Sequence, residues 1–259
     1  LREAAPCDGD GLCARHERSA GALQTDLERV WDGAFGLFGA STRYGDRTPR
    51  SLATGGAFAD ENEDGRIDLL REYNFGPAID AAERDATSAR RAPTDLIGEA
   101  FYALRYGRAL LGTLPEGVLR AEARAQVRAA RDAVVLAWHR VSAAGVVHYL
   151  NLTLRFFEDF GTEAFEYSAG DFPKHALRWS ALKGRSLGLQ FHAGVWTATE
   201  LREMQRAIGD APVLPDPERE TEGRAYGAGL LALRAELGGR YRFAEGHLGN
   251  RGGTRGWRA

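Results

Sequence analysis

The sequence predicts an all-α protein, and three observations lead to that class. Apolar residues recur every three to four positions along most of the chain, which is the spacing of one helix face. Strand-like alternation is rare, and no fixed-period repeat of the solenoid type occurs. The 259 residues include 44% hydrophobic and 27% charged residues, which is the composition of a folded soluble protein with a substantial core.

Residues 1–22 are expected to form an irregular lead-in. They contain the only two cysteines, Cys7 and Cys13, which flank a glycine-rich turn. This pair either closes a small disulfide loop in an exported protein or remains as two free thiols. Two ligands are too few for a structural zinc site.

A single helical domain is expected over residues 23–237, and its first helix should run from Leu23 to Phe38. The apolar residues of this segment keep helical spacing, and Gly39 is well placed to end the helix. Residues 40–75 are rich in Gly, Asp, Arg and Thr without lasting periodicity, so they are expected to form one long loop. A loop of this length in a compact domain usually has a structural or functional reason.

Six further helices are expected after the long loop. The segment 119–157 should be the longest and most buried, because residues around Trp138 and Val147 are apolar on several faces. Thr197 or Thr199 is expected to cap the helix that ends at Ile208. The Gly- and Arg-rich residues 238–259 should form a flexible tail. The six expected helices are 77–91, 95–111, 115–157, 174–190, 197–208 and 222–237.

The long loop contains an acidic segment that matches the first nine positions of an EF-hand calcium loop. Acidic and amide side chains alternate, a glycine supplies the sharp turn, and the next carbonyl can face the ion. The match fails at position twelve, where Arg71 replaces the usual Glu. The alternative is a solvated acidic turn. The expected calcium ligands are Asp60, Asn62, Asp64, the carbonyl of Arg66 and Asp68, with Glu72 as an additional ligand.

A second candidate site is polar and lies in an otherwise apolar helix. His148 and Asn151 are three residues apart on one helix face, so they could share a ligand or hydrogen-bond each other. The alternative is a satisfied polar pair in the core. His175, in the next expected helix, is a third candidate member of this polar site.

Several function classes are disfavoured by what the sequence contains. No His-Glu-x-x-His, Gly-x-Ser-x-Gly or P-loop pattern occurs, so no catalytic residues are expected. The net charge of −2 and the absence of a basic stripe make nucleic acid a poor partner. No apolar run approaches the roughly 20 residues that span a bilayer, so no transmembrane segment is expected.

Several short motifs resemble those of an uncharacterised family of bacterial envelope proteins related to imelysin. They include Trp-Asp-Gly-Ala-Phe-Gly-Leu-Phe-Gly at 31–39, Glu-Tyr-Asn-Phe-Gly at 72–76, His-Tyr-Leu-Asn at 148–151 and Trp-Ser-Ala-Leu-Lys-Gly at 179–184. The resemblance implies an imelysin-like helical bundle in an exported protein that is often lipid-anchored. It also implies an association with iron uptake, and imelysin-like proteins have been proposed as peptidases.

This chain departs from the family at the residues that could ligate a metal. Related proteins tend to have His-x-x-Glu pairs around the two tryptophan segments. Here the corresponding positions hold Val30 with Gly33, and Arg178 with Ala181. None of these side chains can ligate a metal, so no transition metal is expected.

The sequence therefore favours a non-catalytic, calcium-stabilised binding protein of the periplasm or cell surface on an imelysin-like scaffold. Its partner would be an unknown ligand or another envelope protein. The alternatives are an iron or haem uptake component and a metal-dependent peptidase-like protein.

Overall fold

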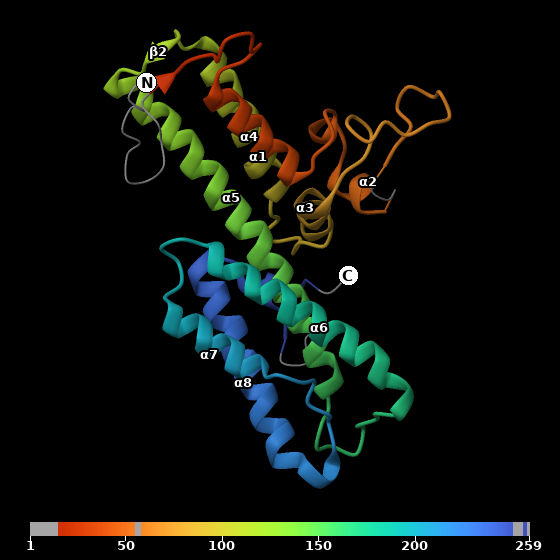
Figure 1. Cartoon of the computed structure of the whole chain (residues 1–259). Coiled ribbons are helices and arrows are strands. Elements are labelled where there is room, and N and C mark those ends of the chain that lie inside the picture. The colour runs from red at the N-terminus through yellow and green to blue at the C-terminus, as the bar shows by residue number, and fades with distance from the viewer. Residues whose placement is uncertain (1–14, 55–57, 251–255, 258–259) are drawn as a thin grey trace. The chain divides into compact units, whose positions relative to one another are not determined.

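The computed structural model describes residues 15–54, 58–250 and 256–257, and this part of the chain is mostly helical (Figure 1). The expected all-α class is confirmed. The α-helices of the described residues are α1 (Asp26–Phe38), α2 (Pro49–Thr54), α3 (Gly76–Ala86), α4 (Leu96–Thr113), α5 (Ala121–Leu154), α6 (Phe172–Gly188), α7 (Ala198–Ile208), α8 (Glu220–Tyr241) and α9 (Glu245–Leu248). Short 3₁₀ turns are η1 (Tyr44–Asp46), η2 (Arg155–Phe157), η3 (Ala169–Asp171), η4 (Leu189–Phe191) and η5 (Pro217–Arg219). Two short strands, β1 (Arg15–His16) and β2 (Gly117–Val118), pair antiparallel.

The chain divides into two compact units rather than the single expected domain over 23–237. Unit 1 comprises residues 1–82 and 95–138, and unit 2 comprises residues 83–94 and 139–259. The helices α3 and α5 each begin in unit 1 and end in unit 2. The cysteine pair of the expected lead-in lies outside the described residues. None of the described helices combines the length and apolar character that crossing a membrane requires.

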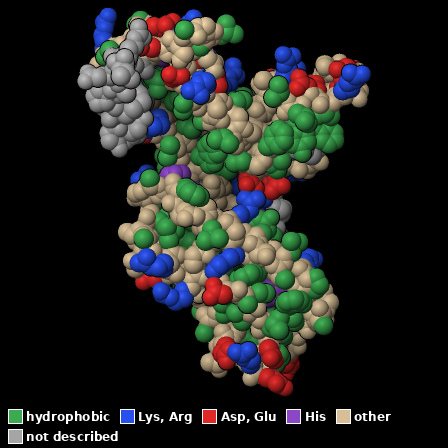
Figure 2. Space-filling view, in the orientation of Figure 1, with side chains coloured by type: hydrophobic (Ala, Val, Ile, Leu, Met, Phe, Trp, Pro, Cys, Tyr) green, Lys and Arg blue, Asp and Glu red, His purple; other side chains and the backbone are tan. Residues whose placement is uncertain are grey.

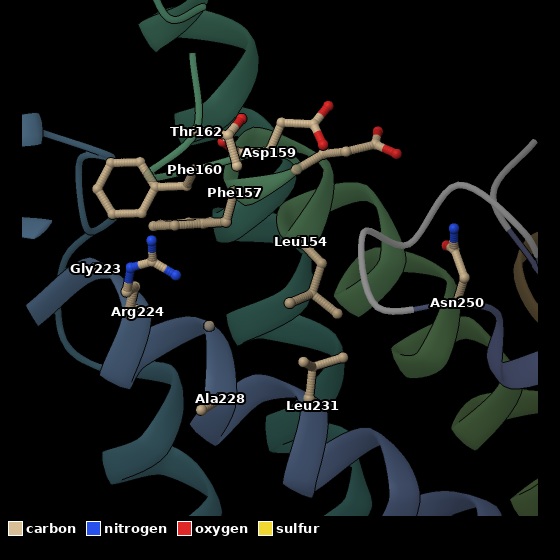
Figure 3. A pocket seen from close by; sticks show the side chains of 12 residues that line it. Leu154, Phe157, Asp159, Phe160, Thr162, Gly223, Arg224, Ala228, Leu231 and Asn250 are labelled. Carbon is tan, nitrogen blue, oxygen red and sulfur yellow. The ribbon is translucent and has the colours of Figure 1, made fainter. Parts of the chain in front are cut away.

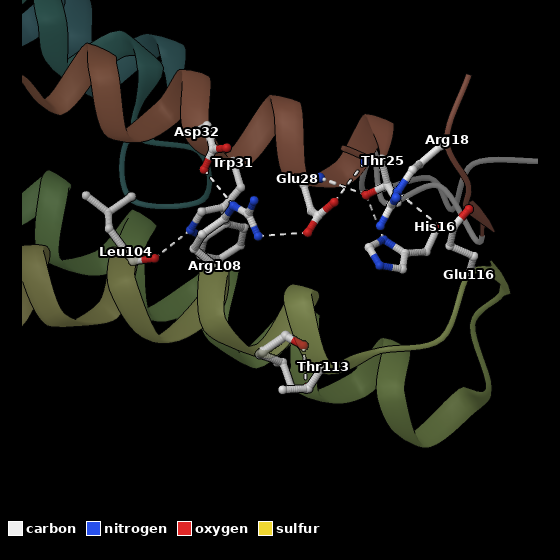
Figure 4. A network of polar contacts seen from close by, with 11 residues as sticks. His16, Arg18, Thr25, Glu28, Trp31, Asp32, Leu104, Arg108, Thr113 and Glu116 are labelled. Carbon is white, nitrogen blue, oxygen red and sulfur yellow. Dashed lines mark hydrogen bonds and ion pairs between the residues drawn. The ribbon is translucent and has the colours of Figure 1, made fainter. Parts of the chain in front are cut away.

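Unit 1 is organised around α1 and α4, which pack antiparallel (Figure 4). The Trp31 indole Nε1 donates a hydrogen bond of 2.6 Å to the Leu104 carbonyl oxygen. The indole ring also covers the backbone of Gly107, where an added Cβ would lie 1.8 Å from Trp31 Cζ2. The two helices can approach this closely because position 107 has no side chain.

The ion pairs of Arg108 extend this helix contact (Figure 4). Its Nε donates to Asp32 Oδ1 and its Nη1 to Glu28 Oε1, both at 2.8 Å. The acceptors are four residues apart on α1, so they face one side of the helix. A single guanidinium therefore joins two turns of α1 to α4.

A capping box begins α1. The Thr25 N–H donates to Glu28 Oε2 at 2.8 Å, and the Glu28 N–H donates to Thr25 Oγ1 at 3.3 Å. The hydrogen bond from Thr25 N–H, followed by the charge of Arg108, outweighs desolvation and lowers the pKa of Glu28. The expected start at Leu23 is wrong, because the helix begins at Asp26 and Leu23 is 94% exposed.

The end of α1 and the ends of the long loop are held together at Gly39. This residue ends α1 with φ +81°, as the sequence predicts, and its carbonyl accepts a 2.7 Å hydrogen bond from Phe75 N–H. Asn74 Oδ1 accepts a further bond of 2.8 Å from Ser41 N–H. The expectation that residues 40–75 form only irregular loop is wrong in part, because η1 and α2 form within them.

Aromatic rings form much of the core of unit 1. Phe38 lies 5.7 Å from Trp138 edge to face, and Tyr44 lies 5.5 Å from Phe101 in a similar arrangement. Tyr44 is fully buried, and its hydroxyl donates a 2.5 Å hydrogen bond to the Ala78 carbonyl oxygen. The aromatic residues of the predicted first helix thus fulfil the expected packing role.

The longest helix, α5, has a different burial pattern in each unit. In its first half the buried residues form one stripe at helical spacing, namely Val127, Ala130, Val134 and Ala137. In its second half nearly every face is buried, including all residues from Ala143 to His148. The expected longest helix is confirmed, and its all-round burial is confined to the part in unit 2.

In unit 2, side chains of α6 and α8 contact that second half of α5: Arg185 lies 5.1 Å from the Tyr149 ring centroid, and Arg234 Nη1 donates to Asn151 Oδ1 at 2.6 Å. Helix α7 packs against α6 and α8 (Figure 1). Two side-chain donors bond the carbonyl at the end of α7: Trp179 Nε1 and the Tyr226 hydroxyl reach Ile208 O at 3.0 and 3.2 Å. Lys183 Nζ donates to Gly209 O at 2.6 Å, which places a positive charge at the helix C-terminus. At its other end α7 has a capping box from Thr197, one of the two expected caps.

The chain after residue 237 departs from the expected flexible tail. Helix α8 continues to Tyr241, α9 follows, and Trp257 is completely buried. Trp257 Nε1 donates a 2.9 Å hydrogen bond to the Arg84 carbonyl, and its ring packs 4.8 Å from Phe243. Phe191, at the end of η4, is in contrast 77% exposed, although a large aromatic side chain at the end of an expected helix would suit the core.

The Trp31–Gly107 contact gives a test of the unit 1 packing. Gly107→Ala should lower the free energy of unfolding by about 1–3 kcal/mol, because the new methyl group collides with the indole. Gly112→Ala is the matched control on the same helix, since its Cβ would be 3.6 Å from the nearest atom. There the higher helix propensity of Ala should stabilise by about 0.5 kcal/mol. Urea unfolding measures both, and equal effects would contradict this packing.

Candidate functional site

The acidic segment forms a closed loop within the longer 40–75 connection of unit 1. Its base is tied by an antiparallel bridge between Phe58 and Tyr73 and by the Ala59 N–H, which donates 3.1 Å to the Glu72 carbonyl. Figure 2 shows charged side chains at the outer end of this projection and hydrophobic ones nearer its base. The loop is therefore a defined hairpin-like projection and not an open coil.

Backbone N–H groups organise the side-chain oxygens at the start of the loop. The two oxygens of Asp60 accept from the N–H groups of Asp64 and Gly65 at 3.1 and 2.8 Å. Asn62 Oδ1 also accepts from Asp64 N–H, and Asp64 Oδ1 accepts from Arg66 N–H at 2.8 Å. Gly65 has φ +76°, which agrees with its predicted role as the sharp turn.

Glu72 closes the loop from the other end. Its Oε1 accepts from the N–H groups of Glu61 at 3.0 Å and Asn62 at 3.3 Å, and its Oε2 accepts from Asp68 N–H at 2.9 Å. The side chain is buried. Both oxygens thus hold the two halves of the loop together, a role that the sequence reasoning, which expected a calcium ligand, did not find.

The loop has a marked excess of negative charge. Residues 60–72 contain six carboxylates and two arginines, which leaves a formal charge of −4. Two ion pairs offset part of this charge: Arg43 with Glu61 at 3.1 Å and Arg71 with Asp68 at 3.8 Å. Asn62, Asp64 and Asp68 remain exposed. Over residues 15–54, 58–250 and 256–257, no three His, Cys, Asp or Glu side chains gather closely enough to hold a metal as they stand.

The second candidate site lies in the buried half of α5, in unit 2. Asn151 is fully buried, and its amide donates 2.9 Å to the Trp257 carbonyl while its Oδ1 accepts 2.6 Å from Arg234 Nη1. His148 and Asn151 do not hydrogen-bond each other. The expected pairing of these two residues is therefore replaced by separate partners from α8 and from the C-terminal part of the chain.

Arg234 is the residue that ties this network together. It is buried on the inner stripe of α8, and its Nη2 donates to the carbonyls of Gly249 and Asn250 at 3.3 and 2.7 Å. These three acceptors, the Asn151 amide oxygen and the two carbonyls, are neutral, and burial lowers the pKa of Arg234. An arginine on the apolar stripe Leu230–Leu233–Leu237 was the sequence signal that could have identified it.

His148 occupies an electropositive part of the core. It is 7% exposed, and its Nδ1 has no hydrogen-bond partner among the described residues. Burial, followed by the positive charges of Arg84 and Arg185, lowers its pKa to about 3. The imidazole is therefore neutral at physiological pH.

His175 lies apart from these residues in an aromatic box. Its ring stacks 4.5 Å from Phe156, and Phe157 and Tyr167 stand edge-on to it at 6.0 and 5.9 Å. Burial, followed by the charge of Arg178, lowers its pKa to about 4. The structure thus separates His175 from the environment shared by His148 and Asn151.

A stacked histidine pair in unit 2 was not singled out from the sequence. His139 and His192 stack at 3.9 Å, and His192 Nδ1 lies 2.6 Å from the Tyr241 hydroxyl, which accepts from Trp196 Nε1. Burial, followed by His139, lowers the pKa of His192 to about 3. These residues are distant in sequence, so their spacing contained no signal.

The positions that hold metal-type pairs in imelysin-related proteins lie in different units. Val30 and Gly33 are on α1 of unit 1, and Val30 is 64% exposed. Arg178 and Ala181 are on α6 of unit 2, where the guanidinium lies 5.2 Å from the ring of Phe156. No family model, curated protein or solved structure matches the chain.

The neutral, buried histidines predict a loss of stability in acid. His148, His175 and His192 have folded-state pKa values of about 3, 4 and 3, below the usual value near 6.5. At a pH between the folded-state and unfolded-state pKa values, the unfolded chain binds more protons than the folded chain. The free energy of unfolding is therefore highest above about pH 6.5 and falls as the pH decreases. From pH 7 to pH 5 each histidine should lower the free energy of unfolding of unit 2 by about 2 kcal/mol.

Urea unfolding at both pH values, with His175→Phe beside the wild type, tests this prediction. Phenylalanine fits the aromatic box without titrating, so the variant should lose about 2 kcal/mol less over the same range. An unchanged pH dependence in the variant would exclude His175 as one of the titrating groups.

Proposed function

We propose that this chain is a non-catalytic, calcium-stabilised binding protein that acts outside the cytoplasm. The observation that carries the proposal is the closed loop at residues 60–72, in which oxygen donors alternate around a glycine turn under a formal charge of −4. Hard cations such as Ca²⁺ prefer carboxylate, amide and carbonyl oxygens in a flexible arrangement. A bound calcium ion would offset the repulsion between these carboxylates.

The donor set fits calcium in its chemistry. Asp60, Asn62, Asp64 and Asp68 supply side-chain oxygens, and Arg66 supplies its carbonyl. The hydrogen bonds to these side chains use one lone pair of each oxygen and leave a second for an ion. Glu72 Oε1 already accepts two N–H bonds that close the loop, and Oε2 accepts one, so by the same count Oε2 is the Glu72 atom that can supply the additional ligand.

Two features support an extracytoplasmic binding role. Without a bidentate Glu at the twelfth position, the loop should bind calcium in the ~10⁻⁴–10⁻³ M range of extracellular modules. Four large apolar side chains near the acidic ones are between 48% and 83% exposed, namely Phe58, Leu69, Leu70 and Phe75. Exposed apolar side chains beside a polar rim are typical of surfaces that bind a partner, here another envelope protein.

The imelysin-like scaffold is part of the same proposal. The motif at 31–39 forms the C-terminal part of α1, and its Trp31 fixes the contact with α4. The motif at 179–184 lies in α6, and its Trp179 and Lys183 bond the end of α7. Both motifs therefore have structural roles that would favour their retention in an all-helical scaffold.

Calcium should stabilise the wild-type protein against heat. At about 10 mM calcium, binding with these affinities adds roughly 1.4–2.7 kcal/mol, because the ion binds the folded state alone. The thermal midpoint of unit 1 should therefore rise by several degrees relative to EGTA. Asp64→Ala removes a ligand and should abolish the response.

Glu63→Gln is the matched control for this experiment. It removes one negative charge from the same loop at a position that supplies no ligand, so the calcium response should persist. A wild-type midpoint that ignores calcium would identify the loop as a solvated acidic turn. The same conclusion would follow if Asp64→Ala responded as strongly as Glu63→Gln.

The purified protein should contain no stoichiometric iron or zinc, which distinguishes it from an iron or haem uptake component and from a metallopeptidase. The reason is that positions 30, 33, 178 and 181 hold Val, Gly, Arg and Ala, none of which supplies a metal ligand. Elemental analysis of protein prepared without chelator measures this directly. Val30→His with Gly33→Glu, and Arg178→His with Ala181→Glu, should gain affinity for iron or zinc if these pairs form the family's site.

A further inference from the structure

A cavity of about 360 Å³ lies in unit 2, between the turn that follows α5 and one face of α8 (Figure 3). Four apolar side chains, Leu154, Phe157, Phe160 and Leu231, form what we call its floor, and the rest of the lining is largely polar. The volume is within the range of small-molecule sites. None of these residues belongs to the calcium-type loop.

Two glycines on successive turns of α8 create the hollow. At Gly223 an added Cβ would lie 2.4 Å from the Phe160 ring, so the ring occupies the space of the missing side chain. At Gly227 the nearest atom to an added Cβ is Phe157 Cβ, at 4.0 Å. Position 227 therefore leaves open space above the floor, which a larger side chain would fill.

The rim has two carboxylates without partners. Glu158 and Asp159 line the cavity, and neither side chain has a hydrogen bond or ion pair with any described residue. Asp159 adopts φ +58°, a backbone conformation that is uncommon for a residue other than glycine. Its carbonyl accepts from the N–H and hydroxyl of Thr162 at 2.9 and 2.7 Å, and these bonds hold the turn in place.

The positive charge at the cavity is already neutralised. Arg224 Nε donates to Glu220 Oε1 at 2.5 Å, and its Nη2 donates to the Gly161 carbonyl at 3.2 Å. Counting Glu158, Asp159, Glu220 and Arg224 gives three negative charges and one positive charge, a local charge of −2. The electrostatics of the cavity thus favour a cation over an anion.

We infer that this cavity binds an organic ammonium ion. The apolar body of the ligand lies on Phe157 and Phe160, and its ammonium group meets the carboxylates of Glu158 and Asp159. Both contacts favour binding, because the apolar body is removed from water on the phenyl side chains and the unpaired carboxylates gain a counter-ion. The site is independent of the proposed calcium loop, since all its residues belong to unit 2.

The test compares three probes of similar shape and different charge: 2-phenylethylammonium, 2-phenylethanol and 3-phenylpropionate. Binding is followed by NMR titration of the full chain at low salt, with calcium and with EGTA. The ammonium probe should bind about fivefold to tenfold tighter than the alcohol, with the carboxylate weakest. The result should be the same with and without calcium, so failure of the calcium proposal leaves it unaffected.

Two sets of variants assign the binding to this cavity. Glu158→Gln with Asp159→Asn should bring the ammonium probe to the affinity of the alcohol; Asn tolerates the backbone of position 159. Gly227→Leu should abolish binding of both probes by filling the hollow. Gly229→Leu is its matched control on α8, since position 229 is also open but does not line the cavity.

Three results would overturn the inference. The first is equal binding of the three probes, or no binding of the ammonium probe up to about 10 mM, the range expected for so small a ligand. The second is a cation preference that survives removal of both carboxylates. The third is undiminished binding to folded Gly227→Leu.

Discussion

The continuous helix α5 is the constraint on which the rest of the structure depends. Its first half presents one apolar stripe and its second half is apolar on nearly every face. A single stripe requires cover on one side, whereas an all-round apolar helix must be surrounded. Unit 1 provides cover through the aromatic cluster around Phe38 and Trp138, and in unit 2 side chains of α6 and α8 contact the second half, as Arg185 does at Tyr149 and Arg234 does at Asn151. The division of the chain into two units follows from this change along one helix.

The two units also differ in whether their charged and titratable side chains are exposed or buried. In unit 1 the acidic loop keeps three of its six carboxylates exposed to water, where an excess of charge is tolerable and a cation can reach it. In unit 2 Arg234 is buried among neutral acceptors, and three histidines are held neutral by burial. A buried cation is tolerated only when its donors are satisfied, which explains why three acceptors from two segments converge on Arg234. The excess of negative charge and the buried neutral histidines thus belong to different units.

The candidate binding features occur where regular helices end. The acidic loop lies between α2 and α3, and the unit 2 cavity lies at the turn after α5. At such places polar backbone groups need partners other than the helix itself, and side chains such as Glu72 and Thr162 supply them. Loops held in this manner on a rigid helical scaffold are common locations for binding residues.

Local chemistry was sufficient to predict much of the fold. Helical periodicity located seven of the helices, with ends that differ from the structure by up to six residues. Gly39 and Thr197 were recognised as helix ends, and the 60–68 segment was recognised as a turn organised by Gly65. Thr25 and Glu28 form a capping box that was equally visible in the sequence and would have placed the start of α1 correctly.

Contacts between distant residues could not be predicted in this way. The burial of Trp257 depends on Arg84 and Phe243, the partners of Asn151 come from positions 234 and 257, and Phe191 is exposed because nothing packs over it. Likewise, spacing predicted Glu72 only as a metal ligand and did not show that its oxygens close the loop. Spacing along the chain reports which residues share a helix face or a turn. Which segment covers that face, and which donor reaches a given oxygen, is decided by packing between residues that are far apart in the sequence.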